Sequence, residues 1–265
     1  MAVTVKDLWY SYPDQTCALN GIDLSISKGK KTAILGINGS GKSTLLYHFN
    51  GTFLPQKGSV KVLGIPLVAS EVETIRKTVG FLFDMPDHQL FATSVKRDVA
   101  FGPRNHRYSK TEQEQAVVRA MSQVGITEFA DKPPYNLSLG QKKRTAIAGI
   151  LAVSPEVIVC DEPFSGLDRV AADQFQVVLD DWVKEGKTLI FSTHDLDLVY
   201  AWADQVILMH LGKVLAAGEV CSIMSDQQLM DTAELRRPIL AELFADRQEK
   251  PRTQKEAVEL LRKER

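Results

Sequence analysis

One stretch of the sequence has the glycine, lysine and serine spacing of a phosphate-binding loop. It reads Gly36-Ile37-Asn38-Gly39-Ser40-Gly41-Lys42-Ser43-Thr44. An apolar run at 32–35 precedes it and a helix-compatible stretch at 43–49 follows it, which is the strand–loop–helix context that such a loop requires. Glycines let successive backbone N–H groups converge on phosphate oxygens, and the helix N-terminus adds partial positive charge. We expect Lys42 to reach the β- and γ-phosphates of a nucleotide and Ser43 to place its hydroxyl on Mg²⁺.

Two carboxylates follow a second apolar run, at 157–160. Asp161 would end a buried strand beside the phosphate-binding loop, where an aspartate can hold Mg²⁺ through water. Glu162 is placed to polarise an attacking water molecule. His194 ends a further apolar strand, and strand order would bring it to the sheet edge of Lys42 and Glu162, within reach of a γ-phosphate oxygen. The alternative for a lone histidine at a strand end is a structural role.

A second predicted helix start has the character of an anion-binding site. Its residues are Leu137-Ser138-Leu139-Gly140-Gln141. Ser138 can cap this helix while free N–H groups point outward. One nucleotide does not need two such helix starts in one chain, so we expect this one to complete the site of another subunit. Asp168 ends a predicted tight turn at 165–168 beside that interface.

The order of the predicted elements indicates an α/β fold. Strand patterns are expected at 3–8, 22–26, 32–35, 59–63, 79–83, 157–160, 188–192, 206–209 and 213–215. Helices are expected at 43–49, 71–77, 94–100, 111–124, 138–152 and 170–184. The helix between the strands at 157–160 and 188–192 makes a strand–helix–strand unit that feeds a parallel sheet. The core sheet is therefore interrupted by a helical insert, roughly 84–154.

The last part of the chain, 219–265, has a different pattern. The following apolar residues are expected on one helical face: Leu235, Ile239, Leu240, Leu243 and Phe244. Beyond Pro251 the chain is rich in charge around a small apolar patch of Val258, Leu260 and Leu261. Two interpretations stay open, a tail packed on its own domain or an appendage that serves dimerisation.

Composition and charge exclude several classes of protein. The 265 residues, 44% hydrophobic and 25% charged, allow one large domain or one domain with a small appendage. A net charge of −1 gives no electrostatic basis for binding nucleic acid. No stretch approaches the about 18 uninterrupted apolar residues of a membrane span, and the N-terminus lacks the pattern of a signal peptide. The scattered cysteines fit a reducing cytoplasm. Together with four of the histidines they lack metal-ligand spacing: Cys17, Cys160, Cys221, His48, His88, His106 and His210.

These motifs, in this order, resemble the ATPase subunit of ABC transporters over residues 1 to about 218. The resemblance implies a P-loop NTPase fold with a RecA-like core sheet, an N-terminal antiparallel β-subdomain and a helical insert. Residues 219–265 would add a C-terminal helical extension. In this family two ATPase subunits enclose two ATP molecules, and each site combines the Walker A loop of one chain with the signature of the other.

By resemblance, 36–43 is the Walker A loop, and 157–161 is the Walker B strand with Glu162 as the catalytic carboxylate. The signature is 137–141 and the D-loop is 165–168. His194 would be the switch histidine. Tyr12 resembles the aromatic residue that stacks on adenine, for which its flat ring is suited. Trp9 and Tyr10 are near enough to leave that register open.

Two positions depart from the family pattern. The signature usually has Gly where Leu139 stands, but Ser138, Gly140 and Gln141 remain to start the helix. Asp84 stands where the family normally has a Gln that contacts Mg²⁺ and the attacking water. A carboxylate there can coordinate Mg²⁺, but it also lies close to the γ-phosphate charge. We hypothesise that Asp84 makes turnover more dependent on Mg²⁺ and alters coupling to the membrane partner.

The segments 86–91 and 98–103 resemble those of energy-coupling-factor importers. The likeness is closest to the branch that imports cobalt or nickel, and the vitamin-importing branch is the alternative. The resemblance implies a second ATPase subunit (a homodimer is favoured), a transmembrane coupling subunit and a substrate-capture membrane subunit. It also implies peripheral attachment to the cytoplasmic face of the cell membrane, with a helix of the transmembrane partner docking near 84–103.

Three rival functions are weighed against this interpretation. A non-transport ABC ATPase is disfavoured by the single P-loop and the near-neutral charge. A hydrolytically impaired regulatory subunit is disfavoured by the intact Lys42, Asp161, Glu162 and His194, although Asp84 keeps that alternative open. An ABC exporter or a conventional importer is disfavoured by the 86–91 segment.

Overall fold

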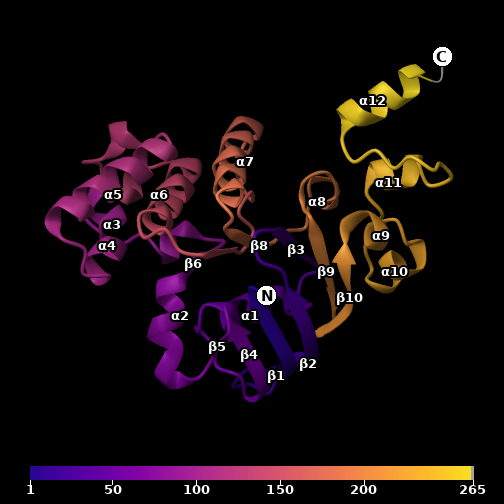
Figure 1. The fold of residues 1–265 in the computed structure, drawn as a ribbon, viewed down its shortest axis with the longest axis horizontal. Coiled ribbons are helices and arrows are strands. Elements are labelled where there is room, and N and C mark those ends of the chain that lie inside the picture. Colours follow the sequence, from indigo (N-terminus) through magenta and orange to yellow (C-terminus); the bar gives the residue numbers. More distant parts are fainter. Residues whose placement is uncertain (264–265) are drawn as a thin grey trace.

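The computed structural model describes residues 1–263 and contains two β-sheets flanked by helices (Figure 1). The smaller sheet has the strand order β2-β1-β4-β5, and all of its pairings are antiparallel. Its strands are β1 (Val3–Ser11), β2 (Cys17–Ile26), β4 (Lys57–Val62) and β5 (Ile65–Pro66). This arrangement, together with the larger sheet and its helices, confirms the predicted α/β fold.

A bulge in β1 explains the spacing of its apolar residues. Val3, Val5 and Leu8 are all buried, although a regular strand would place Val5 and Leu8 on opposite faces. The pairing register shifts between Val5 and Leu8, and Asp7 there has a φ of 46°. The extra residue of the bulge therefore returns Leu8 to the core face.

The larger sheet carries the strand order β10-β9-β3-β8-β7-β6. Its strands are β3 (Lys31–Leu35), β6 (Val79–Leu82), β7 (Val157–Cys160), β8 (Thr188–Ser192), β9 (Gln205–His210) and β10 (Lys213–Glu219). All neighbours pair in parallel except the β9–β10 hairpin, which turns at Leu211 and Gly212 as predicted. Strands β6, β7 and β8 are buried throughout, which explains why they appear in the sequence as continuous apolar runs.

Helices surround the larger sheet and fill the predicted insert. Helix α1 (Lys42–Phe49) follows β3, and α2 (Val72–Thr78) precedes β6. The insert holds α3 (Val95–Val99), α4 (Phe101–Asn105), α5 (Lys110–Gln123) and α6 (Leu139–Leu151), which Figure 1 shows grouped on one side of the molecule. Helix α7 (Arg169–Lys184) connects β7 to β8, and α8 (Leu196–Trp202) connects β8 to β9.

Short 3-10 turns complete these connections. They lie at Ala69–Glu71, Pro86–His88, Thr127–Phe129 and Pro134–Asn136. Helix α6 approaches β6 closely enough that Ile150 leaves no space for a side chain at Gly80. The insert is therefore seated on the edge strand of the sheet through its last long helix.

Four short helices follow β10 within residues 220–263. They are α9 (Val220–Met224), α10 (Gln227–Thr232), α11 (Ile239–Leu243) and α12 (Gln254–Lys263). The prediction of one helical face from Leu235 to Phe244 is wrong, because Leu235 lies before Pro238 in a non-helical segment. Phe244 is buried, whereas Leu243 is 70% exposed. The proline at the start of α11 prevents one continuous helix from forming.

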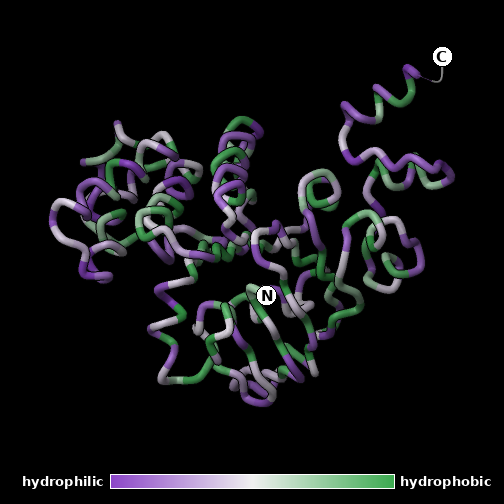
Figure 2. Tube along the Cα trace, in the orientation of Figure 1, coloured by the Kyte–Doolittle hydropathy of each residue, from purple (hydrophilic) through white to green (hydrophobic). Residues whose placement is uncertain are grey.

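Helix α12 lies away from both sheets (Figure 1), and polar and apolar residues alternate along it (Figure 2). Arg252, just before it, donates from Nε to the carbonyl oxygen of Tyr200 at 2.7 Å and from Nη2 to that of Ala203. This contact ties the start of α12 to the end of α8. Among residues 1–263 there is no helix with the length and apolar character needed to cross a membrane.

Candidate nucleotide-binding site

A cavity of about 400 Å³ opens where β3 and β7 end, between the two sheets. Its volume lies in the range of small-molecule sites. Its lining residues are Tyr12, Thr16, Cys17, Ala18, Asn38, Gly39, Gly41, Lys42, Ser43, Thr44, Asp84, Asp161 and Glu162. The cavity therefore brings together the predicted phosphate-binding loop and the acidic pair Asp161 and Glu162. It also contains Asp84, which departs from the family pattern, and Tyr12, the predicted adenine-stacking residue.

The phosphate-binding loop has the conformation that its glycines allow. Gly41 has a φ of 100°, and an added side chain there would collide with the carbonyl oxygen of Ala18. Helix α1 starts at Lys42, and no side chain of residues 1–263 caps its first N–H groups. Those N–H groups and the helix dipole therefore favour an anion at this point. Gly36, Ile37 and Ser40 belong to the loop but not to the cavity lining, and Ser40 is buried.

Lys42 is held inside the loop by backbone oxygens. Its Nζ donates to the carbonyl of Gly36 at 2.8 Å and to that of Ile37 at 3.0 Å. Burial lowers the pKa of Lys42, while the carboxylates of Glu162 and Asp161 oppose that shift. The ammonium thus lies beside the cavity with two neutral acceptors, and phosphate oxygens entering the cavity would offer it charged ones.

The sequence left open which of Trp9, Tyr10 and Tyr12 contacts the adenine base, and the structure separates the three. Tyr12 lines the cavity and shares a hydrogen bond of 2.8 Å between its hydroxyl and Thr44 Oγ1. Tyr10 instead stacks on Phe53, with 4.7 Å between ring centroids, and Trp9 donates to Asp7. Of the three, Tyr12 is therefore the one placed to contact a ligand.

The carboxyl ends of β7 and β8 join the acidic pair to Ser192 and His194. Ser192 Oγ donates to Asp161 Oδ1 at 2.5 Å and accepts from the backbone N–H of Glu162 at 3.0 Å. His194 Nδ1 lies 3.1 Å from Glu162 Oε2. The expectation that strand order brings His194 to Glu162 is confirmed, because β8 lies between β3 and β7. The imidazole itself is largely exposed, with 74% of its side chain accessible.

Sequence reasoning missed two residues that hold this segment. One is Ser192, which bridges Asp161 and Glu162. The other is Lys143, a buried lysine on α6 whose Nζ donates to the carbonyl of Glu162 at 2.9 Å. The sequence offered no signal for Lys143, because it stands between Lys142 and Arg144 in a run of three basic residues. A pattern alone does not reveal which carbonyls such a lysine reaches.

Oxygen donors suited to Mg²⁺ meet at the cavity. Ser43, Asp161 and Asp84 line it together. Within residues 1–263, no group of three or more His, Cys, Asp or Glu side chains is arranged to hold a metal ion by itself. Mg²⁺ is usually bound by one or two carboxylates together with substrate phosphates, and the oxygen donors Ser43, Asp161 and Asp84 suit that kind of site.

The second predicted helix start lies outside this cavity. Ser138 caps α6 by accepting from the N–H of Gln141 at 3.3 Å, and Gln141 Oε1 accepts from the N–H of Ser138 at 3.0 Å. Leu139 lies against Gly166, and Gly140 faces Leu167. Of the residues that the structure describes, none between 138 and 141 lines the cavity. This helix start therefore does not contribute to the nucleotide cavity of its own chain.

Asp168 follows Leu167 and caps the next helix, α7. It accepts from the N–H of Ala171 at 2.8 Å. This capping gives Asp168 a structural role in its own chain and fixes the turn that precedes α7.

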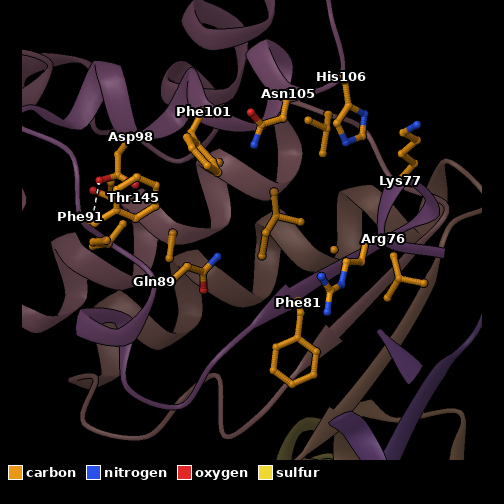
Figure 3. Close-up of a pocket in the computed structure, with 18 of the residues that line it drawn as sticks. Arg76, Lys77, Phe81, Gln89, Phe91, Asp98, Phe101, Asn105, His106 and Thr145 are labelled. Carbon is orange, nitrogen blue, oxygen red and sulfur yellow. Dashed lines mark hydrogen bonds between the residues drawn. The ribbon is translucent and has the colours of Figure 1, made fainter. Parts of the chain in front are cut away.

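A second cavity, of about 420 Å³, lies between β6, α2 and the helical insert. Figure 3 shows Phe91 and Phe101 on one part of its wall and Arg76, Lys77 and His106 on another. The two phenylalanine rings are in edge contact, with 4.8 Å between centroids. The position of Phe91 is fixed by the buried Asp98, which accepts from the N–H groups of Phe91 at 3.0 Å and Ala92 at 2.7 Å. The result is a preformed groove with an apolar wall and a charged rim, in which Lys77 pairs with Glu73 at 2.8 Å.

Comparisons with known proteins agree with this geometry. The chain matches the family model for the ABC transporter over residues 19–165. It is 49% identical over 244 residues, 91% of this chain and 88% of the relative, to the energy-coupling factor transporter ATP-binding protein EcfA of Methanocaldococcus jannaschii. It is 43% identical over 266 residues, 99% of this chain and 98% of the relative, to EcfA of Carboxydothermus hydrogenoformans.

Two solved structures are similar over most of their length. CbiO1 from Clostridium perfringens, part of the ABC transporter complex CbiONQ, matches with a TM-score of 0.77 and 38% identity, covering 92% of this chain and 98% of that chain. A dimeric ATP-binding cassette in a post-hydrolysis state bound to ADP and phosphate matches with a TM-score of 0.75 and 27% identity, covering 82% and 98% of the two chains.

Proposed function

Because the chain belongs to the ABC transporter family, we propose that it is the ATP-hydrolysing subunit of an energy-coupling-factor importer. The observation that carries this proposal is the single cavity in which the phosphate-binding loop meets Asp161 and Glu162, with His194 in contact with Glu162. ATP is the substrate, and the coupled reaction is transport.

The residues of the cavity divide the work of hydrolysis. The N–H groups of α1 and the Lys42 ammonium bind the phosphates and stabilise the negative charge that develops on the γ-phosphoryl group. Glu162 accepts a hydrogen bond from the attacking water and orients it. His194 holds the Glu162 carboxylate and would hydrogen-bond a γ-phosphate oxygen when ATP is bound. Tyr12 supplies a flat surface for adenine.

Mg²⁺ would be held by Ser43 and Asp161, with Asp84 as an additional oxygen donor. When bound, the ion neutralises phosphate charge and orients the β- and γ-oxygens. Asp84 adds a further negative charge at this point, where the family normally has a neutral glutamine.

A second ATPase subunit supplies the missing half of each site. Residues 138–141 at the start of α6 lie outside the cavity of their own chain, so the first N–H groups of this helix are available to an ATP molecule held by another chain. A homodimer satisfies this requirement with one kind of chain. Residues 219–265 would strengthen that dimer, since Val258 and Leu261 on α12 are 46% and 45% exposed on a helix that stands apart from the sheets.

The groove of Figure 3 would receive a helix of the transmembrane coupling subunit. Its apolar wall can bury one helix face, and Arg76 and Lys77 on its charged rim can contact acidic groups or helix C-termini. Strand β6 lines this groove, and Asp84, which follows it, lines the nucleotide cavity. A helix that docks in the groove could therefore change the position of Asp84. The chain would therefore work as a peripheral subunit on the cytoplasmic face of the membrane, with a separate membrane subunit capturing the substrate.

The proposed cargo is cobalt or nickel. The overall likeness of the sequence to that branch of importers supports this choice, and so does the similarity to CbiO1 of the CbiONQ complex. A vitamin is the alternative cargo.

Glu162→Gln tests the proposed chemistry. The amide cannot take up a proton from the attacking water, so we expect kcat for ATP hydrolysis to fall about 10²- to 10⁴-fold while ATP still binds. The wild-type rate should rise with the square of protein concentration at low concentration, since two chains form each site. Glu156→Gln, at the other end of β7, is the matched control and should keep the wild-type rate. Undiminished turnover by Glu162→Gln would refute the assignment.

Asp84→Gln tests the unusual acid. Glutamine keeps an oxygen donor for Mg²⁺ but removes the negative charge that repels the γ-phosphate. This repulsion, about 1 kcal/mol in water at 4 Å, must be offset by Mg²⁺ in the wild-type chain, so we expect the Mg²⁺ concentration for half-maximal ATPase to fall about threefold or more. The exposed Asp87, which pairs with Lys142 outside the cavity, provides the control Asp87→Asn. If Asp84→Gln changes neither the Mg²⁺ dependence nor the ATPase of the assembled transporter, the hypothesis is wrong.

Val258→Glu combined with Leu261→Glu tests the role of α12. Each apolar side chain buried in a dimer contributes about 1.5–3 kcal/mol, so the dimer should dissociate at least about tenfold more readily. Sedimentation of the Glu162→Gln chain with ATP, with and without the two changes, measures this. Lys263→Glu is the control for added negative charge on α12. An unchanged dimer would favour the interpretation that the tail packs only on its own chain.

Phe101→Arg tests the membrane partner and the cargo together. A charged side chain on the apolar wall would have to be buried unpaired, so co-purification with the membrane subunits should be lost. Uptake of Co²⁺ or Ni²⁺ by cells expressing the complete transporter should fall to the level of cells without this chain. Val118→Arg, on the exposed side of α5, is the control. Loss of vitamin uptake with unchanged metal uptake would overturn the cargo assignment.

A further inference from the structure

Lys143 is a buried cation that the nucleotide cavity does not use. It lies on α6, five positions after Ser138, and is only 1% exposed. It is absent from the cavity lining, so it does not contact the nucleotide in its own chain. Burying an ammonium group is costly unless its hydrogens find acceptors. The identity of those acceptors therefore indicates what the residue does.

All three acceptors belong to one short segment of main chain. Lys143 Nζ donates to the carbonyl oxygens of Ser165 at 2.7 Å, Glu162 at 2.9 Å and Pro163 at 3.3 Å. A lysine ammonium has three N–H donors, and this segment occupies them all. The segment runs from the proposed catalytic carboxylate into the turn before α7.

The conformation of Glu162 shows why such a clamp is needed. Its φ of 46° lies in the left-handed region, which is uncommon for a residue with a side chain. Such strain persists only where the surrounding structure over-determines it. Here Ser192 Oγ holds the N–H of Glu162, and Lys143 holds its carbonyl. Both peptide groups that flank the Glu162 Cα are therefore fixed, one from β8 and one from α6.

A second contact joins the same two elements. Leu139, in the first turn of α6, lies against Gly166, and a side chain added at Gly140 would meet Leu167. The first two turns of α6 thus touch the segment 162–167 through both apolar packing and the Lys143 hydrogen bonds. Burial lowers the pKa of Lys143, and the negative charges of Asp84 and Glu162 counteract this shift. These carboxylates therefore stabilise the ammonium that makes the three hydrogen bonds.

We propose that Lys143 is a positioning residue that transmits the engagement of α6 to the main chain of Glu162 in the same chain. This inference rests on the proposed function, in which the start of α6 contacts the ATP held by the other subunit. When that contact shifts α6, the Lys143 link moves the Glu162 carbonyl with it. Each chain thereby aligns its own catalytic carboxylate in response to the ATP of its partner, and the two sites become coupled.

Lys143→Met is the test, because it keeps an unbranched side chain of similar length and removes all three donors. Misplacing a reacting group by about 1 Å can cost up to about 10²-fold in rate, so kcat should fall about 10- to 100-fold per folded molecule. The Kd for ATP should stay within about twofold of wild type, since the phosphate-binding loop is untouched. The Hill coefficient for ATP should fall from above 1 in the wild-type chain to about 1.

The control and the second variant separate this role from a merely structural one. Lys187→Met removes another lysine of low exposure, paired with Glu156, and should keep both kcat and the Hill coefficient. Lys143→Gln keeps two N–H donors on a shorter side chain and should change both quantities in the same direction, which provides the test if Lys143→Met does not fold.

A folded Lys143 variant with wild-type kcat and Hill coefficient would overturn the inference while leaving the proposed function intact. A loss of kcat that only follows a loss of ATP affinity would do the same, as would a Hill coefficient of 1 in an active wild-type chain. A wild-type chain that hydrolyses no ATP would instead refute the proposed function, and this inference with it.

Discussion

The position of β8 between β3 and β7 is the constraint on which the whole site depends. Because the three strands are parallel, their carboxyl ends meet at one edge of the sheet, and the loops that follow them share one cavity. Lys42 comes from the first loop, Glu162 from the second and His194 from the third. A different strand order would separate Ser192 from Asp161 and leave the buried carboxylate without its 2.5 Å hydrogen bond.

Buried charge in this region is satisfied by the main chain rather than by opposite charges. Lys42 donates to carbonyls of its own loop, and Lys143 donates to carbonyls of the segment after β7. A neutral acceptor satisfies the hydrogens of an ammonium but leaves its charge available to another partner. For Lys42 that partner would be the phosphate. For Lys143 the positive charge instead attracts the nearby carboxylates of Asp84 and Glu162. Hydrogen bonds to main-chain carbonyls thus leave Lys42 free to bind phosphate and make Lys143 a link between α6 and the segment after β7.

The sequence predicted the parts of the site that depend on local pattern. The phosphate-binding loop, the Asp161–Glu162 pair and the capping by Ser138 each follow from a few neighbouring residues. The strand order then predicted that His194 would lie at the same sheet edge as Glu162. Lys143 and Ser192 could not be predicted, because their acceptors and donors lie about 20–30 residues away and depend on how α6 and β8 pack. The prediction of one helical apolar face from Leu235 to Phe244 was wrong. The spacing of apolar residues alone does not show that Pro238 interrupts the helix.

Leu139 shows how a departure from the family signature can be accommodated. The helix start needs Ser138 and Gln141, whose reciprocal hydrogen bonds are intact, and it does not need a glycine between them. Replacing a glycine by leucine near the start of a helix favours the helical state by up to about 1 kcal/mol. The leucine side chain also gains contact with Gly166. Both effects stiffen the first turn of α6 and fasten it to the turn before α7. A rigid first turn is what the Lys143 link requires, because a helix that frays at its start would absorb the displacement before it reached Glu162.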